Sequence, residues 1–210
     1  MRPLDLEQVA ALRDALPPRW QAIVSVGFGA GLRSGEALGL TVDRVDFLRR
    51  TLTVDQQLVT PKAGAPHLAT PKTAASRLDV PLPDYVVESL SAHLAQFPAG
   101  VHGLIFTGER GQPKRRTRFS DMWRLAVERG GLPAGTRFHD LRHTYASLLI
   151  RAGCSVKVVQ ARLGHATAQE TLETYAHLCP DDDDRTRAAV DRAIGAAVDH
   201  RWTKGAVHLG

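Results

Sequence analysis

Three side chains that can carry positive charge lie close together in the segment 139–143. His139 is three residues before Arg142 and four before His143, and on an α-helix these spacings place all three on one face. Gathering cationic groups on one face is unfavourable unless an anion lies between them. The spacing therefore predicts a site for an anionic group.

A zinc site is the alternative for the same segment, because two histidines four residues apart on a helix can bind one metal ion. Two features disfavour it. The position that would supply a glutamate base holds Asp140, which is one methylene shorter, and Arg142 would stand on the metal-binding face and repel the cation. We expect no metal here, and for His143 taken alone a role in helix packing is favoured over chemistry.

Tyr175 carries a phenolic oxygen that can act as a nucleophile. A single tyrosine on an amphipathic helix is more often a core residue whose hydroxyl reaches solvent. What favours chemistry is the set of residues around it in the sequence. His165 ends the preceding helix ten positions earlier, and the cationic face at 139–143 comes before both.

Basic residues exceed acidic ones, with 27 Lys and Arg against 22 Asp and Glu, a net charge of +5 and a pI near 9.6. Such a balance points to a polyanionic partner only if the charge is clustered. One run is clustered: it contains Lys114, Arg115, Arg116 and Arg118. A solvated loop and a contact with phosphate groups are both open interpretations of this run.

Five short motifs follow one another along the chain. They are Gly31-Leu32-Arg33-Ser34-Gly35-Glu36-Ala37-Leu38, Pro71-Lys72-Thr73-Ala74-Ala75-Ser76-Arg77, His139-Asp140-Leu141-Arg142-His143-Thr144, Leu163-Gly164-His165 and Thr171-Leu172-Glu173-Thr174-Tyr175. In this order they resemble the motifs of the tyrosine recombinase (phage integrase) family, and the second resembles that family's β-hairpin lysine motif. Each motif alone is moderately specific, but five in the family's order are not expected by chance.

The resemblance implies that Tyr175 attacks a DNA phosphodiester, which gives a covalent 3′-phosphotyrosine and a free 5′-hydroxyl. Arg33 and Arg142 would stabilise the charge that builds on the phosphate oxygens, because their planar, permanently charged guanidinium groups suit a phosphate. His165 would add a further donor. These groups would replace a metal ion, and no ATP or other cofactor is expected.

Proton transfer needs further groups. The phenol has an ordinary pKa of about 10, so forming phenolate at pH 7 costs about 4 kcal/mol without assistance. The resemblance makes His139 the candidate helper and Lys72 the general acid that protonates the leaving 5′-oxygen. Lys62 lies in a second Thr-Pro-Lys triplet and competes with Lys72. Glu36 either orients an arginine or is an exposed helix residue.

Three activities are compatible with this set of residues. The first is a site-specific DNA recombinase, which acts on double-stranded DNA. The second is a DNA-binding remnant whose preserved active site is unused. The third is a type IB topoisomerase, which shares the chemistry but relaxes supercoils without partner strands.

The elements that must position these residues are mainly helical. We expect helices over 4–16, 19–30, 34–40, 85–97, 120–129, 139–152, 155–163, 167–176 and 188–198. The expected N-terminal caps are Asp5 with Gln8, Ser34, Ser120, Ser155, and Thr167 with Glu170. Two β-branched or alternating runs, at 51–54 and 77–82, predict a small antiparallel sheet within 45–82. The predicted class is α+β.

We expect one catalytic domain over residues 1–180, followed by a C-terminal helix and tail over 181–210. Relatives usually carry an N-terminal core-binding domain, which we expect to be absent from this chain. In relatives a C-terminal segment packs on a neighbouring protomer, so the helix at 188–198 docks either in trans within a DNA-bound tetramer or in cis. Docking in cis, with a monomer in the absence of DNA, is the expectation for the isolated domain.

The remaining sequence features point to a cytoplasmic protein with no membrane partner. No stretch approaches the ~18 apolar residues of a membrane helix. Asp5 and Glu7 interrupt the only candidate secretory signal. Cys154 and Cys179 are too few and too far apart for a disulfide framework, which suits a reducing compartment.

Overall fold

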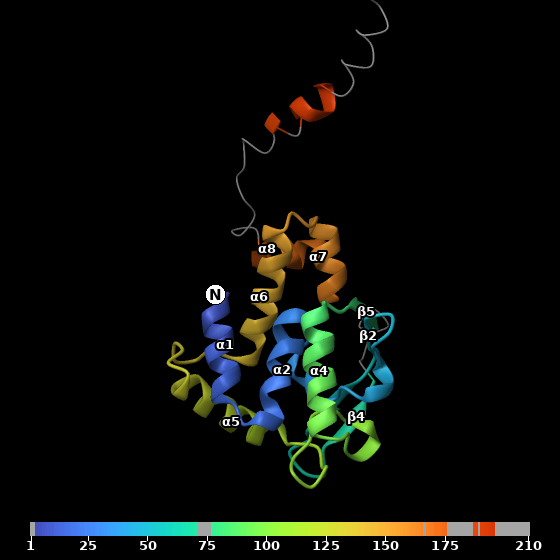
Figure 1. Ribbon diagram of the computed structural model, residues 1–210, viewed down its shortest axis with the longest axis vertical. Helices are drawn as coiled ribbons and strands as arrows, with labels where there is room; N and C mark the ends of the chain where they lie inside the picture. The colour runs from blue at the N-terminus through green and yellow to red at the C-terminus, as the bar shows by residue number, and fades with distance from the viewer. Residues whose placement is uncertain (1–2, 71–76, 166, 176–186, 189, 196–210) are drawn as a thin grey trace, which may run out of the picture. The chain divides into compact units, whose positions relative to one another are not determined.

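The computed structural model describes residues 3–70, 77–165, 167–175, 187–188 and 190–195 (Figure 1). Helices dominate this part of the chain. They are α1 (Leu6–Ala15), α2 (Pro18–Gly29), α3 (Ser34–Leu38), α4 (Asp84–Gln96), α5 (Arg116–Arg129), α6 (Phe138–Arg151), α7 (Val156–Leu163) and α8 (Ala168–Tyr175). Short 3-10 turns occur at Val42–Arg44 and Val101–Gly103. With the small sheets described next, this confirms the predicted α+β class.

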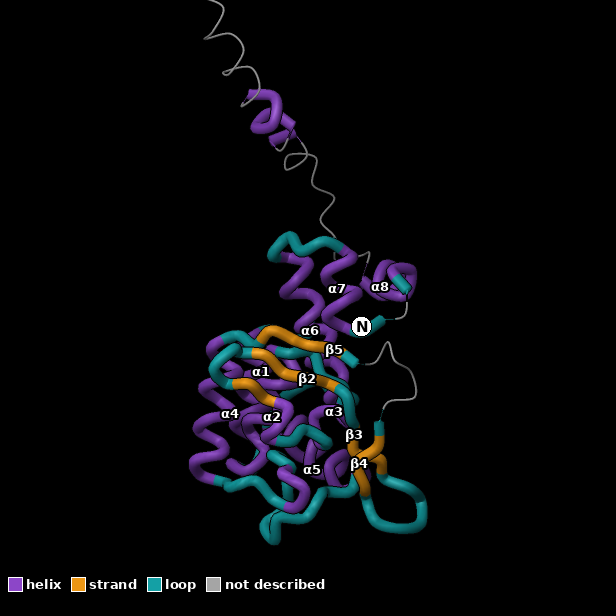
Figure 2. The backbone as a smooth tube through the Cα atoms, turned by 90° about the vertical axis from the view of Figure 1, so that its right-hand side faces the viewer, coloured by secondary structure: helices purple, strands orange, loops and turns teal. Residues whose placement is uncertain are grey.

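The strands form two small antiparallel sheets. The strands are β1 (Val45–Asp46), β2 (Thr51–Val54), β3 (Gln57–Val59), β4 (His67–Ala69) and β5 (Leu78–Pro81). The first sheet has the order β1-β2-β5, and the second pairs β3 with β4. Leu52 faces Val80 across β2 and β5, and both side chains are buried. Figure 2 shows β2 and β5 running side by side, as the alternating sequence pattern predicts.

Helix α2 lies at the centre of the helical core, where it packs against α1, α3, α4 and α6. Its Ile23, Val24 and Val26 side chains are fully buried. Gly27 permits the close approach of α6, because a Cβ atom at this position would lie 2.6 Å from Cδ1 of Leu141. The cationic motif of α6 is thereby held against the helix that leads to Arg33.

Several predicted helix ends are confirmed. The N-cap Asp5 accepts a hydrogen bond of 2.8 Å from the Gln8 amide, and the Gln8 side chain accepts one of 3.1 Å from the Asp5 amide. Ser155 caps α7 by accepting from the amide of Val158. Gly164 ends the same helix with a φ of 58°, a left-handed conformation that glycine adopts without steric cost.

Two predicted helix caps are wrong. Ser34 is the first residue of α3 and not its cap; the Arg33 amide instead donates to the Glu36 carboxylate. Ser120 lies inside α5, which already begins at Arg116, because the carbonyl of Arg115 accepts from the amide of Phe119 and starts the helix four residues earlier. Part of the basic run is therefore helical.

Residues 179–210 form a second compact unit, distinct from residues 1–178. The structure describes 187–188 and 190–195 of it, which are helical. The rest of the predicted helix at 188–198 and the acidic run at 181–184 lie outside the described residues. In the described chain, no helix is both long enough and apolar enough to cross a membrane.

Candidate active site

Arg33 stands at the entrance of α3, where Glu36 holds it by two contacts. The Arg33 amide donates to Glu36 Oε2 at 2.7 Å, and the Arg33 guanidinium donates to Glu36 Oε1 at 3.0 Å. The side chain of Glu36 is 11% exposed and that of Arg33 is 43% exposed. Glu36 is therefore the residue that orients the arginine, and the guanidinium keeps an open face toward solvent.

The turn between α2 and α3 depends on Gly31, which has a φ of 68°. A Cβ atom here would lie 2.5 Å from Cδ1 of Tyr145, so the backbone passes directly over that ring. The carbonyl oxygen of Gly31 accepts a hydrogen bond of 2.7 Å from the Arg142 guanidinium. This turn therefore connects the position of Arg33 to that of Arg142.

Arg142 is buried on α6 and is held from two sides. Besides Gly31, its guanidinium donates to the carbonyl oxygen of Leu163 at the end of α7. Burial lowers the pKa of Arg142 to about 10, and the neighbouring charge of Arg33 acts in the same direction, whereas Glu36 opposes it. The group is still charged at neutral pH, so the protein holds a rigid buried cation beside a second, more exposed one.

The two histidines of α6 differ in their surroundings. His139 lies at the surface. Partial burial of its ring is the largest cause that lowers its pKa, followed by the charges of Arg142 and Arg33. His143 is buried, and its ring meets that of His139 edge-on with centroids 4.7 Å apart. Burial is the largest cause that lowers the pKa of His143 as well. Both rings are therefore biased toward their neutral forms.

His165 lies just after Gly164, between α7 and α8. Its Nδ1 shares a hydrogen bond of 2.9 Å with the hydroxyl of Thr171, and its Nε2 lies 3.8 Å from Oε1 of Glu170. Burial lowers the pKa of His165, followed by the charge of Arg142. Its ring stacks on that of Tyr175 with centroids 6.3 Å apart and an interplanar angle of 7°.

Tyr175 ends α8, whose start is fixed by the predicted cap at Thr167, which accepts from the Glu170 amide at 3.2 Å. The tyrosine is 3% exposed and belongs to a small core cluster formed by α6, α7 and α8. Its hydroxyl lies 2.8 Å from Nδ1 of His143, within hydrogen-bond distance. Burial raises the pKa of Tyr175, the charge of Arg142 acts against this, and Glu170 reinforces it.

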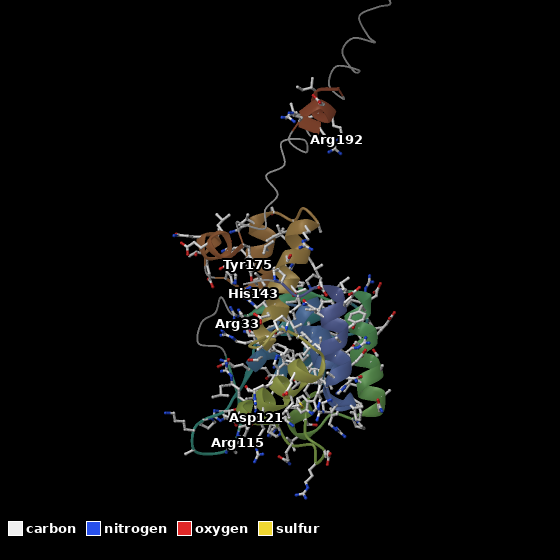
Figure 3. The ribbon with its side chains drawn as sticks, turned by 90° about the vertical axis from the view of Figure 1, so that its left-hand side faces the viewer. Arg33, Arg115, Asp121, His143, Tyr175 and Arg192 are labelled. Carbon is white, nitrogen blue, oxygen red and sulfur yellow. The ribbon has the colours of Figure 1, made fainter. Side chains whose placement is uncertain are left out.

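These contacts bring five of the six predicted catalytic residues into one region. Arg33 and Arg142 line one small pocket, and His165 and Tyr175 stack beside it. His139 reaches Tyr175 through the ring of His143, which touches both. Figure 3 shows Tyr175, His143 and Arg33 on neighbouring elements. The sixth predicted residue, Lys72, lies outside the described residues, and the competing Lys62 is exposed.

His143 is the residue whose contact the sequence did not predict. The spacing favoured helix packing for it, and its bond to Tyr175 depends on how α8 folds back beside α6. A signal was present in the four-residue spacing from His139, which places both rings on one face of the helix. Nothing in the sequence indicated which tyrosine that face would meet.

The basic run is divided between structural and surface roles. The ammonium of Lys114 lies 4.9 Å from the centre of the Trp20 ring, and Arg115 donates to the carbonyls of Pro61 and Gly64 between β3 and β4. Arg116 instead lines a hollow of about 660 Å³ that also contains Arg33 and His139. Two more arginines, missed from the sequence, line this hollow: Arg124 and Arg137. Arg118 is exposed on the first turn of α5.

A metal centre would require several ligating side chains at one place. Within the described ranges, no group of three or more His, Cys, Asp or Glu side chains is placed to hold a metal ion. The two histidines of α6, which could have formed a zinc pair, instead meet each other edge-on.

Sequence comparison relates most of the chain to known proteins. The model of the phage integrase family matches residues 2–181. A tyrosine recombinase XerC-like protein of Caldanaerobacter subterraneus subsp. tengcongensis is 30% identical over 195 residues, which cover 83% of this chain and 50% of that protein. Tyrosine recombinase XerD of Corynebacterium glutamicum is 30% identical over 191 residues, which cover 85% and 57%. The chain thus spans about half the length of these curated relatives.

Solved structures share the fold. The integrase of transposon Tn1549, in complex with transposon right end DNA, superposes with a TM-score of 0.78 at 23% identity, covering 91% of this chain and 65% of that one. The XerA recombinase superposes with a TM-score of 0.66 at 22% identity, covering 86% and 66%. At these identities the likeness establishes the arrangement of the helices and the small sheet.

Proposed function

Because the chain belongs to the phage integrase family, we propose that it cleaves and rejoins DNA through a covalent bond between Tyr175 and a 3′-phosphate. The observation that carries this proposal is the convergence of Arg33 and Arg142 on one pocket beside the tyrosine. Two fixed cations suit the negative charge that builds up at a phosphate in the transition state. Recombination at a specific DNA site is the biological activity that we propose.

In the proposed reaction the phenolic oxygen of Tyr175 attacks phosphorus and the 5′-oxygen leaves. Arg142 supplies a rigid charge, because both backbone carbonyls that it binds fix its guanidinium. Arg33 supplies a more exposed fork held by Glu36. A planar guanidinium binds two phosphate oxygens at once, which stabilises the charge of the pentacoordinate phosphate without a metal ion. Rejoining is the reverse attack by a 5′-hydroxyl.

Proton transfer is assigned to residues near this pocket. His139 would assist removal of the phenolic proton, since its lowered pKa keeps the ring neutral near pH 7. His165 would donate to a phosphate oxygen, and its bond to Thr171 fixes the ring for this purpose. Lys72 would protonate the leaving 5′-oxygen. In the sequence Lys72 lies between β4 and β5.

The proposed substrate is double-stranded DNA. Four arginines line the hollow of about 660 Å³ next to His139, namely Arg33, Arg116, Arg124 and Arg137, and would neutralise successive phosphates. We further propose that the protein is a monomer without DNA and assembles as a tetramer on it, with the helix at 188–198 docking in trans. Light scattering with and without a bound DNA site would test this assembly.

A test of the activity does not require a defined DNA site. A library of nicked duplexes with a randomised central segment is incubated with the protein, and DNA that stays attached after denaturation is recovered and sequenced. We expect a single enriched sequence attached to protein through its 3′ end. DNA that binds but never becomes attached would indicate a DNA-binding remnant instead. Relaxation of supercoiled plasmid irrespective of sequence would indicate a topoisomerase.

A further inference from the structure

We propose that His143 is the positioning residue for the nucleophile: it holds the hydroxyl of Tyr175 beside Arg142 and His165 so that the phenolic oxygen is oriented for attack. The inference deepens the proposed function and rests on the role of Tyr175 in it. Nδ1 of His143 and the Tyr175 hydroxyl share a hydrogen bond of 2.8 Å, and the ring centroids are 5.5 Å apart at 58°. The bond joins α6 to α8 directly.

Burial makes this bond selective. His143 and Tyr175 are both buried, at 7% and 3% exposure, so water competes little for either polar group. In the part of the chain that the structure describes, Nε2 of His143 makes no hydrogen bond, and the ring's polar contact is therefore concentrated at Nδ1. The hydrogen bond to Tyr175 therefore fixes the orientation of the His143 ring.

His143 acts as a positioner and not as the base. Its pKa is lowered to about 4 by burial, by the neighbouring His139 and by Arg142, with Asp140 opposing. The equilibrium for proton transfer from a phenol with an ordinary pKa of about 10 to a base with a pKa of about 4 is unfavourable by about a millionfold. Tyr175 therefore keeps its proton when it is bonded to His143. The ring that faces Tyr175 is consequently neutral near pH 7.

A neutral imidazole suits this task because, with its proton on Nε2, its Nδ1 accepts a hydrogen bond from the phenolic hydroxyl without taking the proton. The stacked ring of His165 restrains the phenol from a second side, so that rotation about the tyrosine side chain is limited.

The test compares His143→Leu with His143→Asn, because the amide of asparagine occupies nearly the position of Nδ1 and can also donate or accept. On the nicked duplex selected with the wild-type protein, we expect His143→Leu to form the covalent adduct about tenfold more slowly, the size expected for one lost hydrogen bond, and His143→Asn to recover most of the rate. The matched control is His93→Leu, which removes another buried histidine; this one lies on α4, and its ring is hydrogen-bonded to the carbonyl of Ile105. It should leave the rate of the folded protein unchanged.

A second measurement does not depend on DNA. In the ¹⁵N NMR spectrum of histidine-labelled, DNA-free protein, Tyr175→Phe should shift the Nδ1 resonance of His143 and leave that of His93 in place. An unchanged Nδ1 resonance would overturn the contact. A His143→Leu protein that reacts as fast as wild type or faster, or a His143→Asn protein no better than it, would overturn the positioning role. Failure of the wild-type protein to form any adduct would instead refute the proposed function.

Discussion

The two arginines of the candidate site differ in what they do for the fold, and exchanging each for lysine separates them. Arg142 is buried and donates to the carbonyls of Gly31 and Leu163, which belong to different parts of the chain. Arg33 is 43% exposed and bonded to Glu36. Lysine keeps the positive charge in both cases, but its single ammonium cannot span the two carbonyls that Arg142 joins.

The expected costs follow from these contacts. Arg142→Lys loses one of two hydrogen bonds from a charged donor, a loss of about 1.5–3 kcal/mol in the free energy of unfolding. At about 2–4 °C per kcal/mol for a domain of this size, the melting temperature should fall by about 3–12 °C. Arg33→Lys alters a partly exposed ion pair, which is worth less than about 1 kcal/mol, so its melting temperature should fall by less than about 4 °C.

The assay is thermal unfolding followed by circular dichroism at one protein concentration, without DNA, so that no bound ligand contributes to stability. Both variants should also slow formation of the covalent DNA adduct, since lysine lacks the fork that binds two phosphate oxygens. Arg142→Lys is thus expected to lose stability and activity, and Arg33→Lys mainly activity. Equal melting temperatures for the two variants would refute the claim that Arg142 stabilises the fold through its hydrogen bonds to Gly31 and Leu163.

Three further outcomes are expected. The pKa of His143 is about 4 in the folded protein and near 6.5 when unfolded, so the unfolded chain takes up the proton first; stability should be fully present above pH 6.5 and fall by up to about 3 kcal/mol as the pH drops toward 4. Urea unfolding should show a flatter pH profile for His143→Gln, and an unchanged profile would contradict this. In the same assay, Gly31→Ala should lower the free energy of unfolding more than Gly135→Ala does. Both glycines have a positive φ, but a Cβ atom at position 31 would meet the ring of Tyr145, whereas nothing lies within 4 Å of one at position 135. If the two substitutions cost the same, the close approach does not matter. Arg116→Ala should reduce the slope of log affinity against log salt by about one in DNA-binding titrations, and an unaltered slope would remove that residue from the interface.

Local chemistry made much of the fold predictable. Asp5 and Gln8 cap α1 as the sequence indicates, because both partners lie within one turn of chain. Gly164 ends α7 for a similarly local reason. Ser34 and Ser120 have the right residue type for a cap, but the helix starts there are set by other groups: the Glu36 carboxylate for α3 and the Arg115 carbonyl for α5.

The sequence proposed the candidate site as a list of residues, which stays a prediction, and the family resemblance that supplied the list is confirmed. Its connections were not, because they run between distant segments. The bond between His143 and Tyr175 spans 32 residues, and that between Arg142 and Gly31 spans 111. The burial that raises the pKa of Tyr175 is likewise a property of how α8 packs, and a sequence pattern does not contain it.

The roles of the basic residues at 114–118 could not be distinguished from the sequence either. Lys114 packs over the ring of Trp20, whereas Arg116 lines the hollow beside Arg33. The sequence shows both only as members of one basic run. Only the start of α5 decides which side chain turns toward which neighbour.

The identity of the nucleophile is the central claim, and mass spectrometry of the covalent adduct tests it most directly. The adduct formed on the selected nicked duplex is digested with nuclease and protease, and the peptide that carries the residual nucleotide is sequenced. We expect the nucleotide on Tyr175, and no adduct with Tyr175→Phe, which keeps the ring in its buried cluster. An adduct of equal yield with Tyr175→Phe, or a nucleotide on another residue, would contradict the account.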